Sequence, residues 1–151
     1  MSAVGTLNTG HIGLNVTELE RSLDFYRDAL GFQLLGEGKE ADRRYAFLGQ
    51  DGTLVLTLWE QAADGYAATA AGLHHLAFSA GSADEVRRFE TRLRERGVTF
   101  AYDGVVAHRE GAASGGIFFH DPDGTRLEIS VPHGLEGTPA PTADGPTCGF
   151  F

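Results

Sequence analysis

The fold is decided by one stretch of the chain, Gly116-Ile117-Phe118-Phe119-His120-Asp121-Pro122-Asp123-Gly124-Thr125-Arg126-Leu127-Glu128-Ile129-Ser130-Val131, which predicts two strands joined by a tight turn. Pro122 presets its φ for a turn, and Gly124 tolerates a left-handed conformation. In the second run, apolar and polar side chains alternate. Glu128 therefore lies on the face opposite its apolar neighbours, either as a solvated residue or as a buried ligand.

The same order of predicted elements occurs twice in the chain, and the stretch quoted above ends the second copy. A strand at 11–16 or 73–80 precedes a helix that starts with a capping-box pattern and ends at a glycine. The helix starts are Thr17–Glu20 and Ser82–Glu85. Three more strands follow each helix. In the first half they are predicted at 32–37, 44–49 and 54–59, with a loop at 38–43. In the second half they are predicted at 98–103, 117–120 and 125–131, with a long loop at 104–114.

This internal duplication predicts an α+β fold of two βαβββ modules. The modules cover about residues 8–61 and 73–132, and a linker at 62–72 joins them within one domain, 1–132. A Gly- and Pro-rich tail follows at 133–151.

The composition narrows the class of protein. The chain has 151 residues, 42% of them hydrophobic, and a net charge of −9, which argues against nucleic acid or an anionic membrane as a partner. Cys148 is the only cysteine, so the sequence excludes an intramolecular disulfide and a zinc site built of cysteines. No signal peptide or apolar run of membrane-spanning length is recognisable, so we expect a cytoplasmic protein.

Two histidines occupy equivalent positions in the repeat. His11 and His75 open the first strand of each module, and a small residue, Gly13 or Ala77, leaves room in front of each imidazole. Either histidine taken alone is as readily a packed structural residue. Together with Glu128, they favour a shared metal site.

Two imidazoles and a carboxylate form a facial triad, which leaves metal positions open for other ligands. We therefore predict that His11, His75 and Glu128 bind one metal ion. In the first module the position equivalent to Glu128 is Thr57, which we expect to line the pocket without binding the ion. His74 is predicted to point to the opposite face from His75, as a structural residue.

Three segments together resemble the vicinal oxygen chelate superfamily across about residues 8–132: His11-x4-Val16, then Leu19-Glu20-Arg21-Ser22-Leu23-Asp24-Phe25-Tyr26-Arg27-Asp28-Ala29-Leu30-Gly31-Phe32, and Asp121-Pro122-Asp123-Gly124-x3-Glu128. This superfamily includes glyoxalase I, extradiol dioxygenases, fosfomycin-resistance enzymes and bleomycin-binding proteins. The resemblance implies that the two modules form an eight-stranded open cup around a divalent metal.

Individual positions separate the branches of that superfamily. Glyoxalase I has a strong ligand where this chain has Thr57, and thiol-transferring fosfomycin enzymes have a Thr at Gly13 and a Tyr at Phe118. Bleomycin-binding proteins usually lack the ligands. Extradiol dioxygenases use a His-His-Glu iron site, which fits, although they commonly have a Tyr at Phe118. His108 and Arg109 lie near the place where that family has an outer-sphere histidine.

The resemblance thus favours an Fe(II)-dependent, extradiol-type dioxygenase that uses O₂ on a small aromatic or vicinal-oxygen substrate, with Mn, Zn or Ni as alternative metals. We expect His108 to act as an acid–base group, and the alternative is that it is a solvated loop histidine. The residues expected to contact substrate are Thr57, Trp59, Phe118, Arg109 and Gly13, although ordinary core packing is the commoner role for a Trp. Alternatives are a glyoxalase-like isomerase or lyase, a resistance enzyme without O₂ chemistry, and a metal-free drug-binding protein. A homodimer is also expected.

The chain ends with Cys148-Gly149-Phe150-Phe151. We expect these residues to fold back over the mouth of the cup, with the two phenylalanines as anchors that help to exclude water. The alternative is that the phenylalanines contact a partner subunit.

Overall fold

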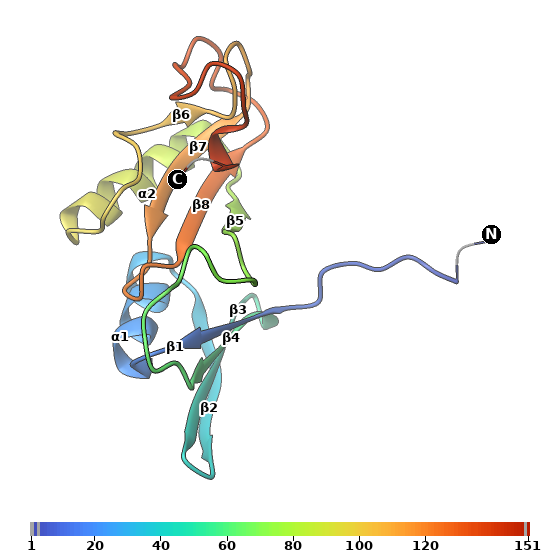
Figure 1. Ribbon diagram of the computed structural model, residues 1–151, viewed down its shortest axis with the longest axis vertical. Helices are drawn as coiled ribbons and strands as arrows, with labels where there is room; N and C mark the ends of the chain where they lie inside the picture. Colours follow the sequence, from blue (N-terminus) through green and yellow to red (C-terminus); the bar gives the residue numbers. More distant parts are fainter. Residues whose placement is uncertain (1, 3, 150) are drawn as a thin grey trace. The chain divides into compact units, whose positions relative to one another are not determined.

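The computed structural model describes residue 2, residues 4–149 and residue 151, and it divides into two compact units, Met1–Asp64 and Gly65–Phe151 (Figure 1). Each unit contains one four-stranded sheet. In each, a strand and a helix precede three further strands. The predicted α+β fold of two βαβββ modules is confirmed.

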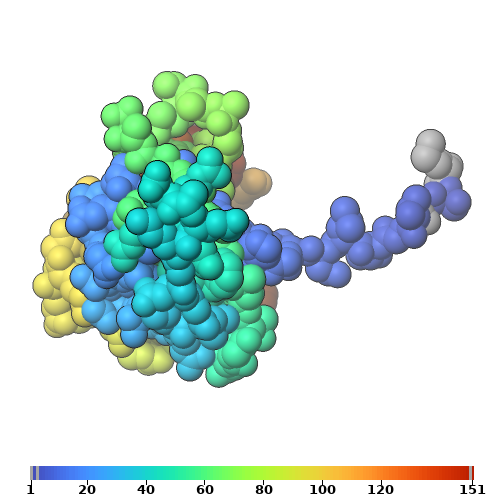
Figure 2. Space-filling model, turned by 90° about the horizontal axis from the view of Figure 1, so that it is seen from below, coloured from blue at the N-terminus to red at the C-terminus, as the bar shows by residue number. Residues whose placement is uncertain are grey.

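The first unit contains β1 (Ile12–Val16), α1 (Leu19–Asp24), a π-helical continuation (Phe25–Ala29), β2 (Gln33–Glu40), β3 (Arg43–Gln50) and β4 (Thr53–Glu60). The sheet order is β1-β4-β3-β2, and β1 is parallel to β4 while the other pairs are antiparallel. The helix packs against β3 and β4 and buries its apolar side. Residues 4–10 are all exposed and extend away from β1 (Figure 2).

The predicted loop at 38–43 is wrong. Both strands continue into it, so that Lys39 pairs with Arg44 and Glu40 with Arg43. Only two residues make the turn, and Ala41 there has a φ of 54°. Charged residues suit this hairpin because its end is solvated, and charge on a sheet edge also opposes pairing with other chains.

The N-cap residue of α1 differs from the one that the capping-box pattern predicts. Glu18 is the N-cap residue, and it makes no side-chain cap hydrogen bond. Instead, the backbone N–H of Leu19 donates to Oε2 of Glu60 at 2.7 Å. The Thr17 hydroxyl accepts from Arg21 at 3.0 Å. A carboxylate from the end of β4 both satisfies a free amide and favours the positive end of the helix dipole.

The second unit contains β5 (Leu76–Ser79), α2 (Ala83–Glu95), β6 (Val106–Ala107), β7 (Gly115–His120), β8 (Arg126–Val131) and a short 3₁₀ helix (Thr147–Gly149). Its sheet order is β5-β8-β7-β6, and α2 packs against β7 and β8 (Figure 1). Here the capping pattern is confirmed. The Ser82 hydroxyl accepts from the Glu85 N–H at 3.2 Å, and the Glu85 carboxylate accepts from the Gly81 N–H at 2.5 Å.

Two strand predictions in this unit need correction. The segment 98–103 forms no strand and makes a single bridge, from Phe100 to Phe119. The adjoining predicted loop supplies β6 instead, because Val106 and Ala107 pair with the start of β7. The strand predicted at 73–80 begins only at Leu76, so both neighbouring histidines precede it.

The predicted tight turn at 121–124 is confirmed. Oδ1 of Asp121 accepts from the N–H groups of Asp123 and Thr125, each at 2.9 Å. The Gly124 N–H donates to the Asp121 carbonyl at 3.0 Å, and Gly124 has a φ of 87°. This turn sets the register in which Phe118 lies opposite Glu128.

The tail packs on the second unit. Leu135 and Thr147 are 1% and 0% exposed, so the tail is buried both near its beginning and near its end. No helix in the described part of the chain is long and apolar enough to cross a membrane.

Candidate metal centre

Glu128 lies in the middle of β8 and is only 3% exposed. Its backbone partners are Ala77 on β5 and Phe118 on β7. An isolated buried carboxylate is costly unless it is paired or hydrogen-bonded. The strand pattern allows a solvated Glu128 or a buried one. The structure excludes the solvated residue, because the side chain is buried.

His108 is one partner of this carboxylate. Its Nε2 lies 2.6 Å from Oε2 of Glu128, and its Nδ1 lies 3.0 Å from the Ser114 hydroxyl. A neutral ring satisfies both contacts when the serine hydroxyl donates to Nδ1 and the Nε2–H donates to the carboxylate. The hairpin between β6 and β7 thus holds His108 against Glu128. Its predicted acid–base role stays a prediction.

His75 lies on the other side of the carboxylate. Its Nε2 is 3.7 Å from Oε1 of Glu128, which is too long for a hydrogen bond but suits two ligands of one ion. Burial lowers the pKa of His75, although Glu128 acts in the opposite direction. The lowered pKa favours the neutral imidazole, which is the form that binds metals.

The strand pattern predicts that His74 points to the face opposite His75, and this prediction is wrong. Nδ1 of His74 is 2.8 Å from Nδ1 of His75, and the two rings are 5.1 Å apart. The alternation fails because neither histidine belongs to β5. If the Nδ1–H of His75 donates to His74, the Nε2 lone pair of His75 is left free on the side of Glu128.

A third potential ligand atom belongs to the tail. Ligand atoms of His75, Glu128 and Cys148 all lie within 4.8 Å of one another. Two ligands of a single ion are at most about 4.4 Å apart, the sum of a metal–sulfur and a metal–nitrogen distance. The three side chains therefore fit a metal ion after small side-chain rotations. Burial raises the pKa of the Cys148 thiol, and Glu128 adds to that effect.

Of the predicted residues of the first unit, Gly13 and Trp59 contact Thr57. His11 is exposed and precedes β1, while Gly13 pairs with Thr57 across to β4. A Cβ at Gly13 would lie 3.1 Å from the Thr57 hydroxyl, which is buried and accepts from Nε1 of Trp59 at 3.3 Å. Trp59 also packs on Tyr45, with ring centroids 5.0 Å apart. Convergence of His11 on His75 and Glu128 stays a prediction.

In the second unit, Phe118 is fully buried, and its ring lies 6.3 Å from His108 and 5.1 Å from Phe151. Arg109 is exposed in the loop after β6. Two supporting residues were not predicted from the sequence. Ser114 contacts His108, and Tyr102 donates a hydrogen bond to Thr147 in the tail. Ser114 is recognisable only once β6 is known, because that strand sets the hairpin that brings it to His108.

Comparison with known proteins identifies the family. Residues 8–129 match the family described as the Glyoxalase/Bleomycin resistance protein/Dioxygenase superfamily. The chain belongs to this superfamily. Its sequence is 32% identical over 123 residues to a catechol-2,3-dioxygenase of Bacillus subtilis, covering 80% of this chain and 40% of that protein. The chain therefore spans less than half of that relative.

Two further relatives are matched over more of their length. A trivalent organoarsenical cleaving enzyme of a Bacillus species is 33% identical over 120 residues, covering 79% of this chain and 70% of the relative. A lactoylglutathione lyase of Escherichia coli O157:H7 is 32% identical over 131 residues, covering 79% and 88%. The superfamily resemblance is confirmed, and dioxygenase and lyase relatives lie at the same level of identity.

Solved structures support the fold. A glyoxalase/bleomycin resistance protein/dioxygenase domain from Frankia has a TM-score of 0.73 at 24% identity, covering 85% of this chain and 94% of that one. The fosfomycin resistance protein FosX of Listeria monocytogenes, complexed with Mn(II) and sulfate, has a TM-score of 0.62 at 20% identity, covering 89% and 98%. At this identity the likeness extends to the fold alone.

Proposed function

We propose that this protein is a divalent-metal-dependent enzyme, an extradiol-type dioxygenase that uses Fe(II) and O₂ on a small aromatic or vicinal-oxygen substrate. The observation that carries the proposal is the buried Glu128 carboxylate, with one oxygen held by His108 at 2.6 Å and the other 3.7 Å from Nε2 of His75. The catechol-2,3-dioxygenase relative, at 32% identity, supports the reaction class.

The metal ligands in this proposal are His11, His75 and Glu128. A bound divalent ion would act as a Lewis acid and as a template for adjacent substrate oxygens. The protein contributes the neutral imidazole of His75, whose Nδ1 is 2.8 Å from that of His74. It also contributes the hydrogen bond from His108, which keeps one Glu128 oxygen occupied and the other directed toward His75.

In this proposal, the side chains around the metal ligands contact the substrate. They also exclude water from the site. Phe118 and Phe151 form an apolar wall, with ring centroids 5.1 Å apart. Such a wall strengthens electrostatic interactions inside the site, since water is kept out. The proposed substrate contacts are Thr57, Trp59, Phe118, Arg109 and Gly13, and the proposed proton carrier is His108 at Nε2.

A lyase or isomerase is the second candidate. The chain covers 88% of the lactoylglutathione lyase relative, against 40% of the dioxygenase relative. The same ligands would serve a reaction without O₂. Thr57 argues for the dioxygenase, because a hydroxyl at that position leaves more metal positions open than a carboxylate would. A metal-free drug-binding protein is the remaining alternative.

The test is anaerobic reconstitution of the metal-free protein with Fe(II), Mn(II), Zn(II) or Ni(II), followed by a screen of catechols on an oxygen electrode. Among the four metal-loaded forms, we expect only the Fe(II)-loaded protein to take up oxygen with a catechol. The Glu128→Gln variant should take up none. Metal bound without oxygen uptake would favour the lyase or isomerase. Failure to bind any of the four metals would favour the drug-binding protein. Light scattering of the same samples tests the expected homodimer.

A further inference from the structure

The C-terminal tail is fastened to the second unit immediately before its cysteine. Thr147 is fully buried, and its hydroxyl donates to the Ala107 carbonyl at 2.6 Å. Its N–H donates to the His108 carbonyl at 2.8 Å, and its own carbonyl accepts from the Tyr102 hydroxyl at 3.0 Å. Three hydrogen bonds on one residue fix the backbone next to Cys148.

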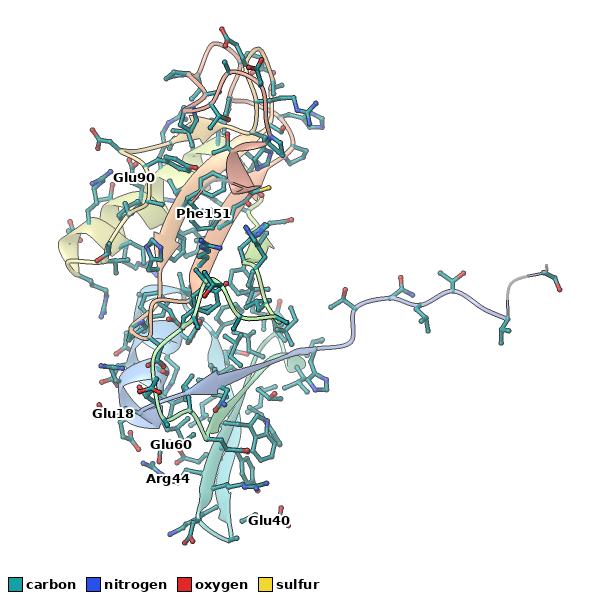
Figure 3. The ribbon with its side chains drawn as sticks, in the orientation of Figure 1. Glu18, Glu40, Arg44, Glu60, Glu90 and Phe151 are labelled. Carbon is teal, nitrogen blue, oxygen red and sulfur yellow. The ribbon has the colours of Figure 1, made fainter. Side chains whose placement is uncertain are left out.

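A second attachment follows the cysteine. The ring of Phe151 lies 5.7 Å from that of His75 and 5.1 Å from that of Phe118, beside β7 and β8 (Figure 3). The Arg126 guanidinium is 5.8 Å from the same ring. Phe150, the other expected anchor, lies outside the described residues. Cys148 is thus held between two contacts, and one of them is with the metal-ligand candidate His75 itself.

The result is a cluster of three different donor groups. Cys148 Sγ lies within 4.8 Å of both a His75 ring nitrogen and a Glu128 carboxylate oxygen. Cys148 is half-buried, so its side chain has limited freedom to turn toward solvent. Imidazole, carboxylate and thiolate together form a donor set that suits zinc, cobalt or iron better than magnesium or calcium.

We propose that Cys148 is a further ligand of the metal, so that the C-terminal tail supplies a thiolate to the ion held by His75 and Glu128. This inference rests on the metal site of the proposed function. On binding, the S–H bond breaks, its proton goes to solvent and a metal–sulfur bond forms, with no change in oxidation state. The thiolate takes one position that a chelating substrate needs, and the tail therefore competes with the substrate.

The test uses Co(II) as a spectroscopic probe on the full-length protein, compared with Cys148→Ser and Cys148→Ala. We expect the wild-type protein to show a near-ultraviolet sulfur-to-cobalt charge-transfer band that both variants lack. Losing a ligand should weaken Co(II) binding by at least the roughly tenfold that loss of an outer-sphere partner costs. Competition with a chromophoric chelator measures this change.

Alkylation provides a second measurement, since Cys148 is the only cysteine and all labelling reports on it. We expect Co(II) to protect the wild-type thiol from iodoacetamide. Protection should be lost in the Glu128→Gln variant. Circular dichroism checks that each variant is folded.

The outcomes separate the two proposals. If Co(II) binds without the charge-transfer band and without protecting the thiol, the Cys148 ligand is wrong while the metal site stands. The same holds if Cys148→Ala binds Co(II) as tightly as the wild-type protein. If the folded wild-type protein binds no Co(II), the metal site fails and the Cys148 ligand fails with it.

Discussion

The two units use the same strand register for different chemistry. In the first unit, Thr57 pairs with Gly13 on the parallel strand and Phe47 on the antiparallel strand. In the second, Glu128 pairs in the same way with Ala77 and Phe118. The backbone positions match, and only the second unit places a charge at the centre.

That one difference explains what gathers around each position. The Thr57 hydroxyl is satisfied within its own strand, by the Trp59 indole at 3.3 Å. The buried Glu128 carboxylate requires stronger partners, and His108 supplies one from a separate hairpin. The duplication thus provides equivalent positions, while the charge of the side chain determines how much supporting structure each position needs.

The largest effect should come from replacing the central residue of the second unit, and the equivalent residue of the first unit provides the comparison. Glu128→Gln removes a charged ligand, so metal affinity should fall by more than the roughly 100-fold upper range for an outer-sphere partner. Thr57→Val should leave metal affinity unchanged and cost about 1–2 kcal/mol of stability, because the Trp59 N–H loses its acceptor. Chelator competition and urea unfolding measure the two quantities. Equal losses of metal in both variants would refute the assignment of Glu128 as a ligand and of Thr57 as a non-ligand.

The support given to Glu128 should have the next largest effect. His108→Asn breaks the hydrogen bond to the carboxylate, and metal affinity should fall about 10–100-fold. Ser114→Ala should produce a smaller loss in the same direction, since His108 remains but its tautomer is no longer fixed. Glu110→Gln, an exposed residue of the same loop, is the matched control. An unchanged affinity in His108→Asn would show that the carboxylate needs no such partner.

The tail covers the second unit, and its terminal ring can be tested in the metal-free protein. Phe151→Ala removes the contacts with His75 and Phe118, so iodoacetamide should label Cys148 several-fold faster. Leu7→Ala changes an exposed side chain of the first unit and should leave the rate unchanged. Equal labelling rates in the three proteins would mean that Thr147 alone holds the tail.

The smallest effects concern the two helix starts, which are capped in different ways. Ser82→Ala should cost about 1 kcal/mol, the usual loss for a side-chain cap. Glu60→Ala should cost about 1–2 kcal/mol, because it removes both a hydrogen bond to Leu19 and a charge near the helix dipole. Urea unfolding measures both. Glu18→Ala serves as the control, because the Glu18 side chain makes no cap hydrogen bond, and it should cost less than either variant.

The sequence predicted those features whose cause is local. The turn at 121–124 depends on Pro122 and Gly124, and the second helix on Ser82 and Glu85, so both were recognisable from neighbouring residues. Glu128 was a candidate ligand because the turn sets its register. The duplication was recognisable because each half repeats the same local pattern.

Features that depend on distant partners escaped prediction. Val106 and Ala107 form a strand only because β7 lies beside them, whereas 98–103 has strand composition but a single bridge. The contact between His74 and His75 arises because both precede β5. Ser114 became part of the site through a hairpin that local propensity did not indicate.

The Glu60 cap has a consequence for how the first unit folds. The amide of Leu19 and its acceptor are 41 residues apart in the chain. The first turn of α1 is therefore completed only after β4 has paired beside β1, and that closure carries the entropy cost of a long loop. This cap couples the start of the helix to the end of β4, so hydrogen exchange at Leu19 should respond to opening of β4 as well as to fraying of the helix end.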